Sequence, residues 1–188
     1  MERPTATIPI PPLGGFTIDD LADLDLPGSA HLIHGGLYIR AARQRWHSVL
    51  SHELAVVFVG VAPNAVVFQN VAVRLDPKHA PQPDILVVRR DTYDGDATSY
   101  PPDVVIIAVE IMSSDQRKDR VVRPDEYAIA GIPHYWRIER TPEKRLIAYT
   151  YELDPVNLKY VETAVHHGRL TTDQPWPLDC DLHGLATP

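Results

Sequence analysis

The sequence predicts a mixed α/β fold in which helices flank one central β-sheet. The chain has 188 residues and is 44% hydrophobic, which is enough to bury one sizeable core. Its longest helical pattern, Gln44–Val61, is followed by a series of short apolar runs typical of strands. Splitting the chain would leave pieces with little core. We therefore expect a single domain over residues 16–188, preceded by a flexible Pro- and Gly-rich arm over residues 1–15.

The first half of the chain predicts a short helix, a hairpin and a long helix. Thr17 can cap a helix over Ile18–Leu24, and two strand-like stretches within residues 31–40 surround the turn Gly35-Gly36. Apolar residues then recur every three or four positions in Gln44–Val61, so this helix should pack one face against the sheet.

The second half predicts most of the sheet. Apolar runs indicate strands at Ala65–Leu75, Ile85–Val88, Val104–Val109, His134–Ile138, Leu146–Leu153, Leu158–Val165 and Trp176–Leu182. Between the third and fourth of these, Asp119–Ala130 has a helical pattern. Pro124 fits a first helical turn better than a helix interior, and Gly131 is well placed to end the helix.

Composition limits the function classes. The net charge of −7 gives no general attraction to phosphate backbones, so any nucleic-acid surface must be local. The single cysteine, Cys180, cannot form an internal disulfide and suits a reducing cytoplasm. No secretory signal pattern is seen, and no apolar segment approaches the roughly 18–20 residues that cross a bilayer. We expect a cytoplasmic protein.

Two acids adjoin strands that should be buried. Glu110 ends the apolar run Val104–Val109, and Asp84 precedes Ile85–Val88. An unpaired buried charge costs several kcal/mol, so each carboxylate needs a partner. Together with the backbone carbonyl of Ile111, the two acids could hold Mg²⁺, which prefers oxygen ligands. Alternatively, Asp84 caps a turn and Glu110 pairs with an arginine, and spacing alone favours this second explanation.

Basic residues follow Glu110 closely. They could contact phosphate oxygens, or they could form an ordinary solvated helix face, the usual outcome for such runs. The residues are Arg117, Lys118, Arg120 and Arg123, and a second basic edge could come from Arg40, Arg43 and Arg45.

The histidines do not show a conventional zinc-binding spacing. His31 and His34 lie on the predicted hairpin, His47 and His52 are five apart on a helix, and His166 and His167 are adjacent. None forms a His-Glu-x-x-His pair or a Cys/His set, so a structural zinc is not expected. A Gly-rich phosphate loop and a Gly-x-Ser-x-Gly elbow are also missing from the sequence.

The order of several motifs resembles the Uma-type restriction endonucleases of bacteria, within the PD-(D/E)XK nuclease superfamily. The resemblance covers roughly residues 16–185 and rests on Pro83-Asp84, Val109-Glu110-Ile111-x-Ser113, Asp119, and Tyr127-x-x-Ala130-Gly131-Ile132-Pro133-x-Tyr135-Trp136. It implies a restriction-endonuclease-like core, with a mixed sheet flanked by helices. It also implies cleavage of nucleic-acid phosphodiesters, foremost in DNA, with Mg²⁺ or Mn²⁺ as cofactor. A homodimer is a further expectation, because such nucleases often pair to reach two strands.

The resemblance assigns Asp84 and Glu110 as metal-binding acids, but two positions depart from the family pattern. His31 stands where the family often has a glutamate, and Arg123 matches the active-site lysine, whose more usual position is occupied by Met112. Arginine stays protonated, so Arg123 can bind phosphate but cannot act as a base. His31 could serve as an accessory ligand for a softer metal such as Mn²⁺.

These departures leave three hypotheses. The first is a metal-dependent endonuclease in which Asp84, Glu110 and Arg123 form the catalytic set. The second is a nuclease-fold protein that has lost catalysis and binds nucleic acid or another protein. The third is a purely structural α/β module, because a fold does not determine a function.

Overall fold

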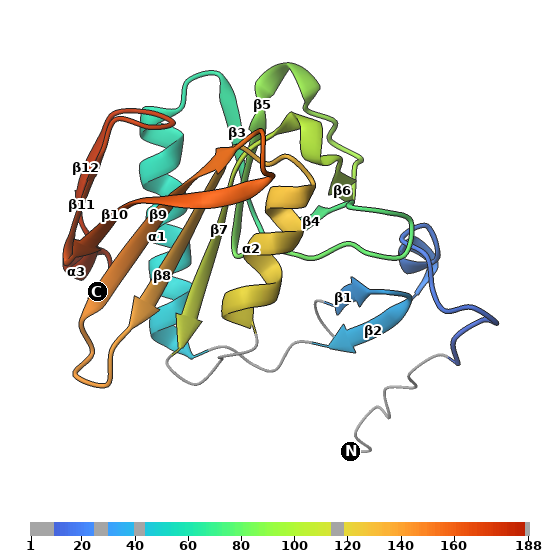
Figure 1. Ribbon diagram of the computed structural model, residues 1–188. Coiled ribbons are helices and arrows are strands. Elements are labelled where there is room, and N and C mark those ends of the chain that lie inside the picture. Colours follow the sequence, from blue (N-terminus) through green and yellow to red (C-terminus); the bar gives the residue numbers. More distant parts are fainter. Residues whose placement is uncertain (1–9, 25–29, 40–43, 114–118, 187–188) are drawn as a thin grey trace.

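A six-stranded mixed β-sheet forms the centre of the computed structural model, which describes residues 10–24, 30–39, 44–113 and 119–186 (Figure 1). The strand order is β10-β9-β8-β7-β5-β3. Strands β7 and β8 are parallel and the other neighbours are antiparallel. The strands are β3 (Ala65–Gln69), β5 (Ile85–Arg89), β7 (Val105–Ser113), β8 (His134–Arg140), β9 (Leu146–Asp154) and β10 (Lys159–His167). The predicted fold class is confirmed.

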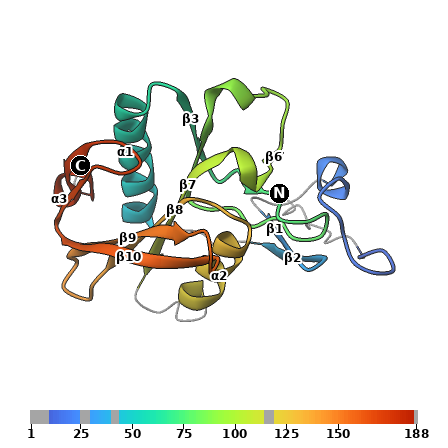
Figure 2. The same ribbon diagram turned by 45° about the horizontal axis from the view of Figure 1, so that its top comes forward.

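Two helices cover opposite faces of this sheet. Helix α1 (Arg45–Val61) lies on one face and α2 (Asp119–Ile129) on the other, as Figures 1 and 2 show from two directions. Side chains alternate between the faces along each strand. In β7, Val109 packs in the core beneath α1 with Trp136 of β8, whereas Ala108 packs beneath α2 with Tyr135. With both faces covered, the central strands β5 and β7 read as nearly continuous apolar runs.

Smaller elements surround the sheet. The β1–β2 and β11–β12 pairs are antiparallel, and β4–β6 is parallel. Their bounds, with those of the short helices, are η1 (Asp20–Asp23), β1 (Ala30–Ile33), β2 (Gly36–Ile39), β4 (Ala72–Val73), η2 (Arg90–Thr92), β6 (Ser99–Tyr100), η3 (Pro102–Val104), β11 (Arg169–Thr172), β12 (Leu178–Asp181) and α3 (Leu182–Ala186).

Three predicted boundaries are wrong. The strand predicted over Ala65–Leu75 stops at Gln69, because Asn70 adopts a left-handed conformation (φ 57°) that strands do not accommodate. The helix predicted over Ile18–Leu24 is a single 3₁₀ turn, Asp20–Asp23, although Thr17 does exchange hydrogen bonds with Asp20. Strand β7 continues to Ser113, so Glu110 lies within the strand and not at its end.

The prediction for Pro124 is also wrong, whereas that for Gly131 is confirmed. Helix α2 begins at Asp119, so Pro124 lies inside it. The first four N–H groups of any helix lack intrahelical partners, and a proline at the sixth position removes only one further bond. Gly131 (φ 83°) ends the helix, with its N–H bonded to Ala128 O and that of Ile132 bonded to Tyr127 O. This is a Schellman motif.

Replacing Gly131 with alanine tests that helix end. No atom lies within 4 Å of the position that an added Cβ would occupy, so the cost comes from the left-handed backbone alone. We expect Gly131→Ala to lower the free energy of unfolding by about 1–2 kcal/mol, measured by urea denaturation. Gly60→Ala, in the exposed last turn of α1 with equally open space, is the matched control and should gain up to about 1 kcal/mol. Equal effects at the two positions would contradict this explanation.

The β1–β2 hairpin is present, but its turn is His34-Gly35 rather than Gly35-Gly36, since Ile33 pairs with Gly36. Across the described part of the chain, no helix is long and apolar enough to cross a membrane. The division into an N-terminal arm and one domain stays a prediction, and residues 1–9 lie outside the described ranges.

Candidate functional site

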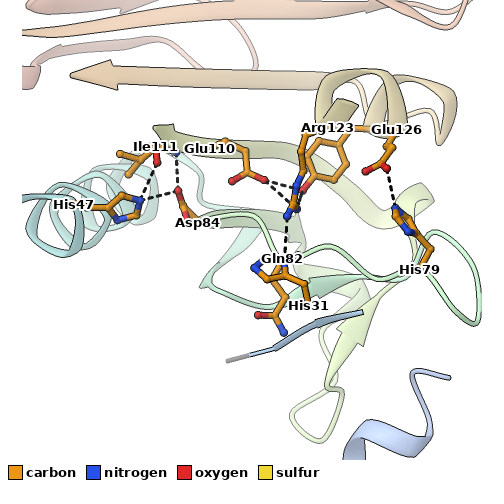
Figure 3. Close-up of polar contacts among 10 residues, drawn as sticks. His31, His47, His79, Gln82, Asp84, Glu110, Ile111, Arg123 and Glu126 are labelled. Atoms are coloured by element: carbon orange, nitrogen blue, oxygen red, sulfur yellow. Dashed lines mark hydrogen bonds and ion pairs between the residues drawn. The ribbon is translucent and has the colours of Figure 1, made fainter. Parts of the chain in front are cut away.

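Asp84 and Glu110 lie opposite each other on neighbouring strands. The antiparallel register of β5 and β7 pairs Ile85 with Val109, and one further step brings Asp84 opposite Glu110. Both are buried, with 2% and 7% of their surface exposed, and Figure 3 shows the Asp84 side chain turned toward His47 and the Glu110 side chain turned toward Arg123. The two acids predicted from the sequence therefore lie at neighbouring strands, and their carboxylates belong to two separate groups of contacts.

The carboxylate of Asp84 meets the backbone of Ile111 and the ring of His47. Asp84 Oδ2 accepts the Ile111 N–H at 2.7 Å and lies 3.1 Å from His47 Nε2, which is 2.9 Å from Ile111 O (Figure 3). A carbonyl oxygen can only accept, so His47 Nε2 carries the proton and donates to both oxygens. One N–H thus faces two oxygen atoms that converge on the same point.

The sequence analysis did not identify His47 as a site residue. It lies in the first turn of α1 and is buried together with Ser51, one turn further on, on the same face as Leu50 and Leu54. Its Nδ1 is buried and makes no hydrogen bond. Buried polar groups need a reason, because burial without a partner is costly. Two polar residues on the apolar face of an amphipathic helix were the signal that could have found this position.

Glu110 belongs to a second group of contacts on the α2 side. Its Oε1 accepts the Tyr127 hydroxyl at 3.1 Å and lies 3.4 Å from Arg123 Nη1, which is also 3.4 Å from the Tyr127 oxygen. Burial raises the pKa of Tyr127 well above its usual value of 10.0; the Glu110 charge raises it further and Arg123 opposes this. The phenol therefore stays protonated and donates to Glu110. The ion pair with an arginine, the plainer of the two explanations for Glu110, is present.

His31 contacts Arg123 from the β1–β2 hairpin. Its Nδ1 lies 3.1 Å from the backbone N of Gln82 and 3.3 Å from Arg123 Nη2 (Figure 3). Both neighbours can only donate, so Nδ1 accepts and the neutral ring carries its proton on Nε2. His31 therefore orients Arg123 in this structure.

The structure gives less information on the other residues that were predicted for the site. Met112 is buried at the end of β7, and Arg45 is exposed at the start of α1. The other basic residues of the two clusters, Arg40, Arg43, Arg117 and Lys118, lie outside the described ranges, and the Arg120 side chain is not described.

Comparison with solved structures defines the class of the fold. The chain resembles a crystal structure described as "a putative nuclease belonging to DUF820 from Anabaena variabilis ATCC 29413", with a TM-score of 0.62 and 18% identity over 91% of this chain and 97% of that one. At that identity the likeness concerns the fold alone, a mixed sheet flanked by helices that the two proteins share. No protein with curated annotation matches the chain in sequence.

The sequence itself places the chain in a family. Residues 19–182 match the Uma2 family, described as "Putative restriction endonuclease". The chain belongs to this family, and the resemblance inferred from its motifs is confirmed.

Proposed function

We propose that the protein is a metal-dependent endonuclease that hydrolyses phosphodiester bonds in nucleic acid, with DNA as the expected substrate. The observation that carries the proposal is the convergence of Asp84 Oδ2 and Ile111 O on one point, with Glu110 on the adjacent strand. Membership of a family described as "Putative restriction endonuclease" supports the same proposal.

The donor set fits a hard divalent cation. Two carboxylates and a carbonyl oxygen match the ligands that Mg²⁺ and Mn²⁺ take, with waters completing the shell. The polarised N–H of His47, 3.1 Å and 2.9 Å from two of these oxygens, marks a position where a positive charge is favoured. A bound ion would activate water and stabilise the charge developing on the phosphate. His47 would then turn aside, or bind through Nε2 with its proton on Nδ1, which suits Mn²⁺ better than Mg²⁺.

Arg123, His31 and Tyr127 position the charged groups around Glu110. Arg123 keeps a fixed positive charge beside Glu110 and can bind a phosphate oxygen, with His31 holding the far side of its guanidinium. Tyr127 fixes the Glu110 carboxylate. Arg123 cannot accept a proton, so the attacking water would lose its proton to a carboxylate or to solvent. In this proposal Arg117, Lys118 and Arg120, in and after the connection from β7 to α2, contact the nucleic-acid backbone.

A second candidate function has a specific observation in its favour. Neither position that could carry the family's lysine has one: Arg123 is paired with Glu110, and Met112 is an apolar buried residue. A nuclease-fold protein that binds nucleic acid or another protein without cleaving would show this arrangement. Pairing of two chains into a homodimer is compatible with either function.

The test is a cleavage assay with supercoiled plasmid, single-stranded DNA and RNA in Mg²⁺, in Mn²⁺ and in EDTA. We expect ion-dependent cleavage that Glu110→Gln lowers by at least about 100-fold, because the variant loses a ligand charge at the reacting phosphate. Glu152→Gln is the matched control, since Glu152 is a half-buried acid on β9, two strands away from β7 in the sheet. Cleavage that is equal in EDTA, or unchanged in Glu110→Gln, would overturn the proposal. Binding without cleavage would favour the second function.

A further inference from the structure

Three potential metal ligands from distant parts of the chain meet beside α2. His34 comes from the β1–β2 turn, His79 from the loop between β4 and β5, and Glu126 from α2. One ligand atom from each lies within 4.8 Å of the other two. We propose that these three residues bind a transition-metal ion, foremost Zn²⁺, at a site separate from Asp84 and Glu110. This proposal does not depend on nuclease activity.

His79 is the residue that most needs a ligand. It is only 3% exposed, yet neither of its ring nitrogens makes a hydrogen bond. Nε2 lies 3.2 Å from Glu126 Oε1 (Figure 3), but the two are not aligned as donor and acceptor. A buried polar group left unsatisfied costs about 1–3 kcal/mol. Metal coordination through one nitrogen would remove part of that cost.

The two histidines are held together by their backbones. Their rings stack with centroids 4.4 Å apart and planes inclined by 23°. The N–H of Gly35, next to His34, donates to the carbonyl of Lys78, next to His79, at 2.8 Å. Gly35 is held from its other side as well, since the N–H of Phe16 donates to its carbonyl oxygen at 2.8 Å. The two turns therefore form one preassembled unit.

The turn conformation makes a histidine at position 34 unusual. His34 (φ 49°) and Gly35 (φ 81°) have the two positive φ angles of a type I′ turn, in which Asn-Gly is the favoured pair. Asparagine at this position would keep the turn and remove the imidazole. Asparagine is therefore a clean substitution for testing the role of the ring.

The ligand chemistry selects the ion. Two imidazole nitrogens and one carboxylate oxygen suit Zn²⁺ and similar metals and disfavour Mg²⁺. Zinc ligands lie about 3.4 Å apart in a tetrahedral site, so the present set has to contract by side-chain rotation. His34 is exposed and Glu126 half-buried, which leaves both able to move toward the fixed His79. The exposed side of His34 would leave a fourth position for water.

An ion here would tie the hairpin to α2. Glu126 follows Arg123 by three residues on α2, which places the two on neighbouring positions of the helix surface. The hairpin that carries His34 also carries His31, the partner of Arg123 (Figure 3). Metal binding would therefore stabilise the contact between His31 and Arg123.

Co²⁺ and Zn²⁺ binding to the full chain tests the site. After chelator treatment, we expect one Co²⁺ per chain with the visible absorption of a tetrahedral site, displaced by Zn²⁺. His34→Asn and Glu126→Gln should each weaken binding by at least about tenfold, and Zn²⁺ should raise the melting temperature of the wild type more than that of these variants. His52→Asn, an exposed histidine on α1, is the matched control.

The competing site is removed by repeating the titration in Asp84→Asn/Glu110→Gln. Binding retained in that double variant and lost in His34→Asn supports the proposal. Two results would overturn it: binding unchanged in both His34→Asn and Glu126→Gln, or binding lost in the double variant alone.

Discussion

Asp84→Asn is expected to lower the Mg²⁺-dependent cleavage rate by about 10²–10³-fold while leaving the fold intact. Asparagine retains an oxygen at the position where Asp84 Oδ2 accepts the Ile111 N–H at 2.7 Å, so the backbone contact survives. The negative charge is lost, and with it the main attraction for a divalent cation. A metal's stabilisation of the transition state is worth several kcal/mol, and each 1.36 kcal/mol is about a factor of ten in rate. Initial rates of plasmid nicking measure the effect.

Two further variants accompany this prediction: one controls for the loss of a negative charge, and the other tests the role of His47. Asp91→Asn, an exposed acid paired with Arg89, should leave the rate unchanged. His47→Ala should weaken Mn²⁺ affinity by about 10–100-fold, the usual effect of removing a residue that holds or orients a ligand. A rate for Asp84→Asn within threefold of the wild type would show that this carboxylate does not serve the reaction.

Arg123→Ala is expected to lower the free energy of unfolding by about 3–5 kcal/mol in EDTA, and divalent metal should restore part of the loss. Both partners of the pair are largely buried, with 12% of the Arg123 side chain and 9% of the Glu110 side chain exposed. Removing one partner leaves the other charge without its compensation. A cation bound beside Glu110 would replace the missing positive charge. Urea denaturation with and without Mn²⁺ measures both parts of the prediction.

Arg137→Ala is the control for the recovery of stability by metal that is expected in Arg123→Ala. Arg137 pairs with Glu139 at 2.8 Å and lies over the ring of Tyr149, so its removal should also destabilise the protein. No metal-binding role is proposed for that pair, and Mn²⁺ should not restore its stability. Equal recovery of the two variants, or none in Arg123→Ala, would argue against a cation next to Glu110.

The centre of the sheet was predictable because its strands are buried on both faces. Ile85–Val88 and Val104–Val109 form continuous apolar runs, and such runs identify strands without alternation. Their ends were less predictable. Glu110 interrupts the apolar pattern of β7, but Tyr127 and Arg123 from α2 satisfy its charge, so the strand continues. Tertiary contacts, which a single sequence does not display, set that boundary.

The two acids were found because a lone carboxylate on a buried strand demands an explanation. His47 was missed because the histidines were judged by their spacing along the chain. Its partners, Asp84 and Ile111, lie 37 and 64 positions away, so only the packing of α1 across the strand ends reveals the contact. The same limit applies to His34 and His79. Their rings stack although the two residues lie 45 positions apart in the sequence (79 − 34 = 45).

Crystals grown with Mn²⁺ and measured at an anomalous wavelength test the nuclease proposal most directly. We expect an anomalous peak bound by Asp84, Glu110 and the carbonyl oxygen of Ile111, at about 2.0–2.3 Å from these oxygens. His47 would no longer lie between Asp84 Oδ2 and Ile111 O, or would bind the ion through Nε2. An unchanged His47–Asp84 contact and no peak between the two acids at saturating Mn²⁺ would contradict the proposal.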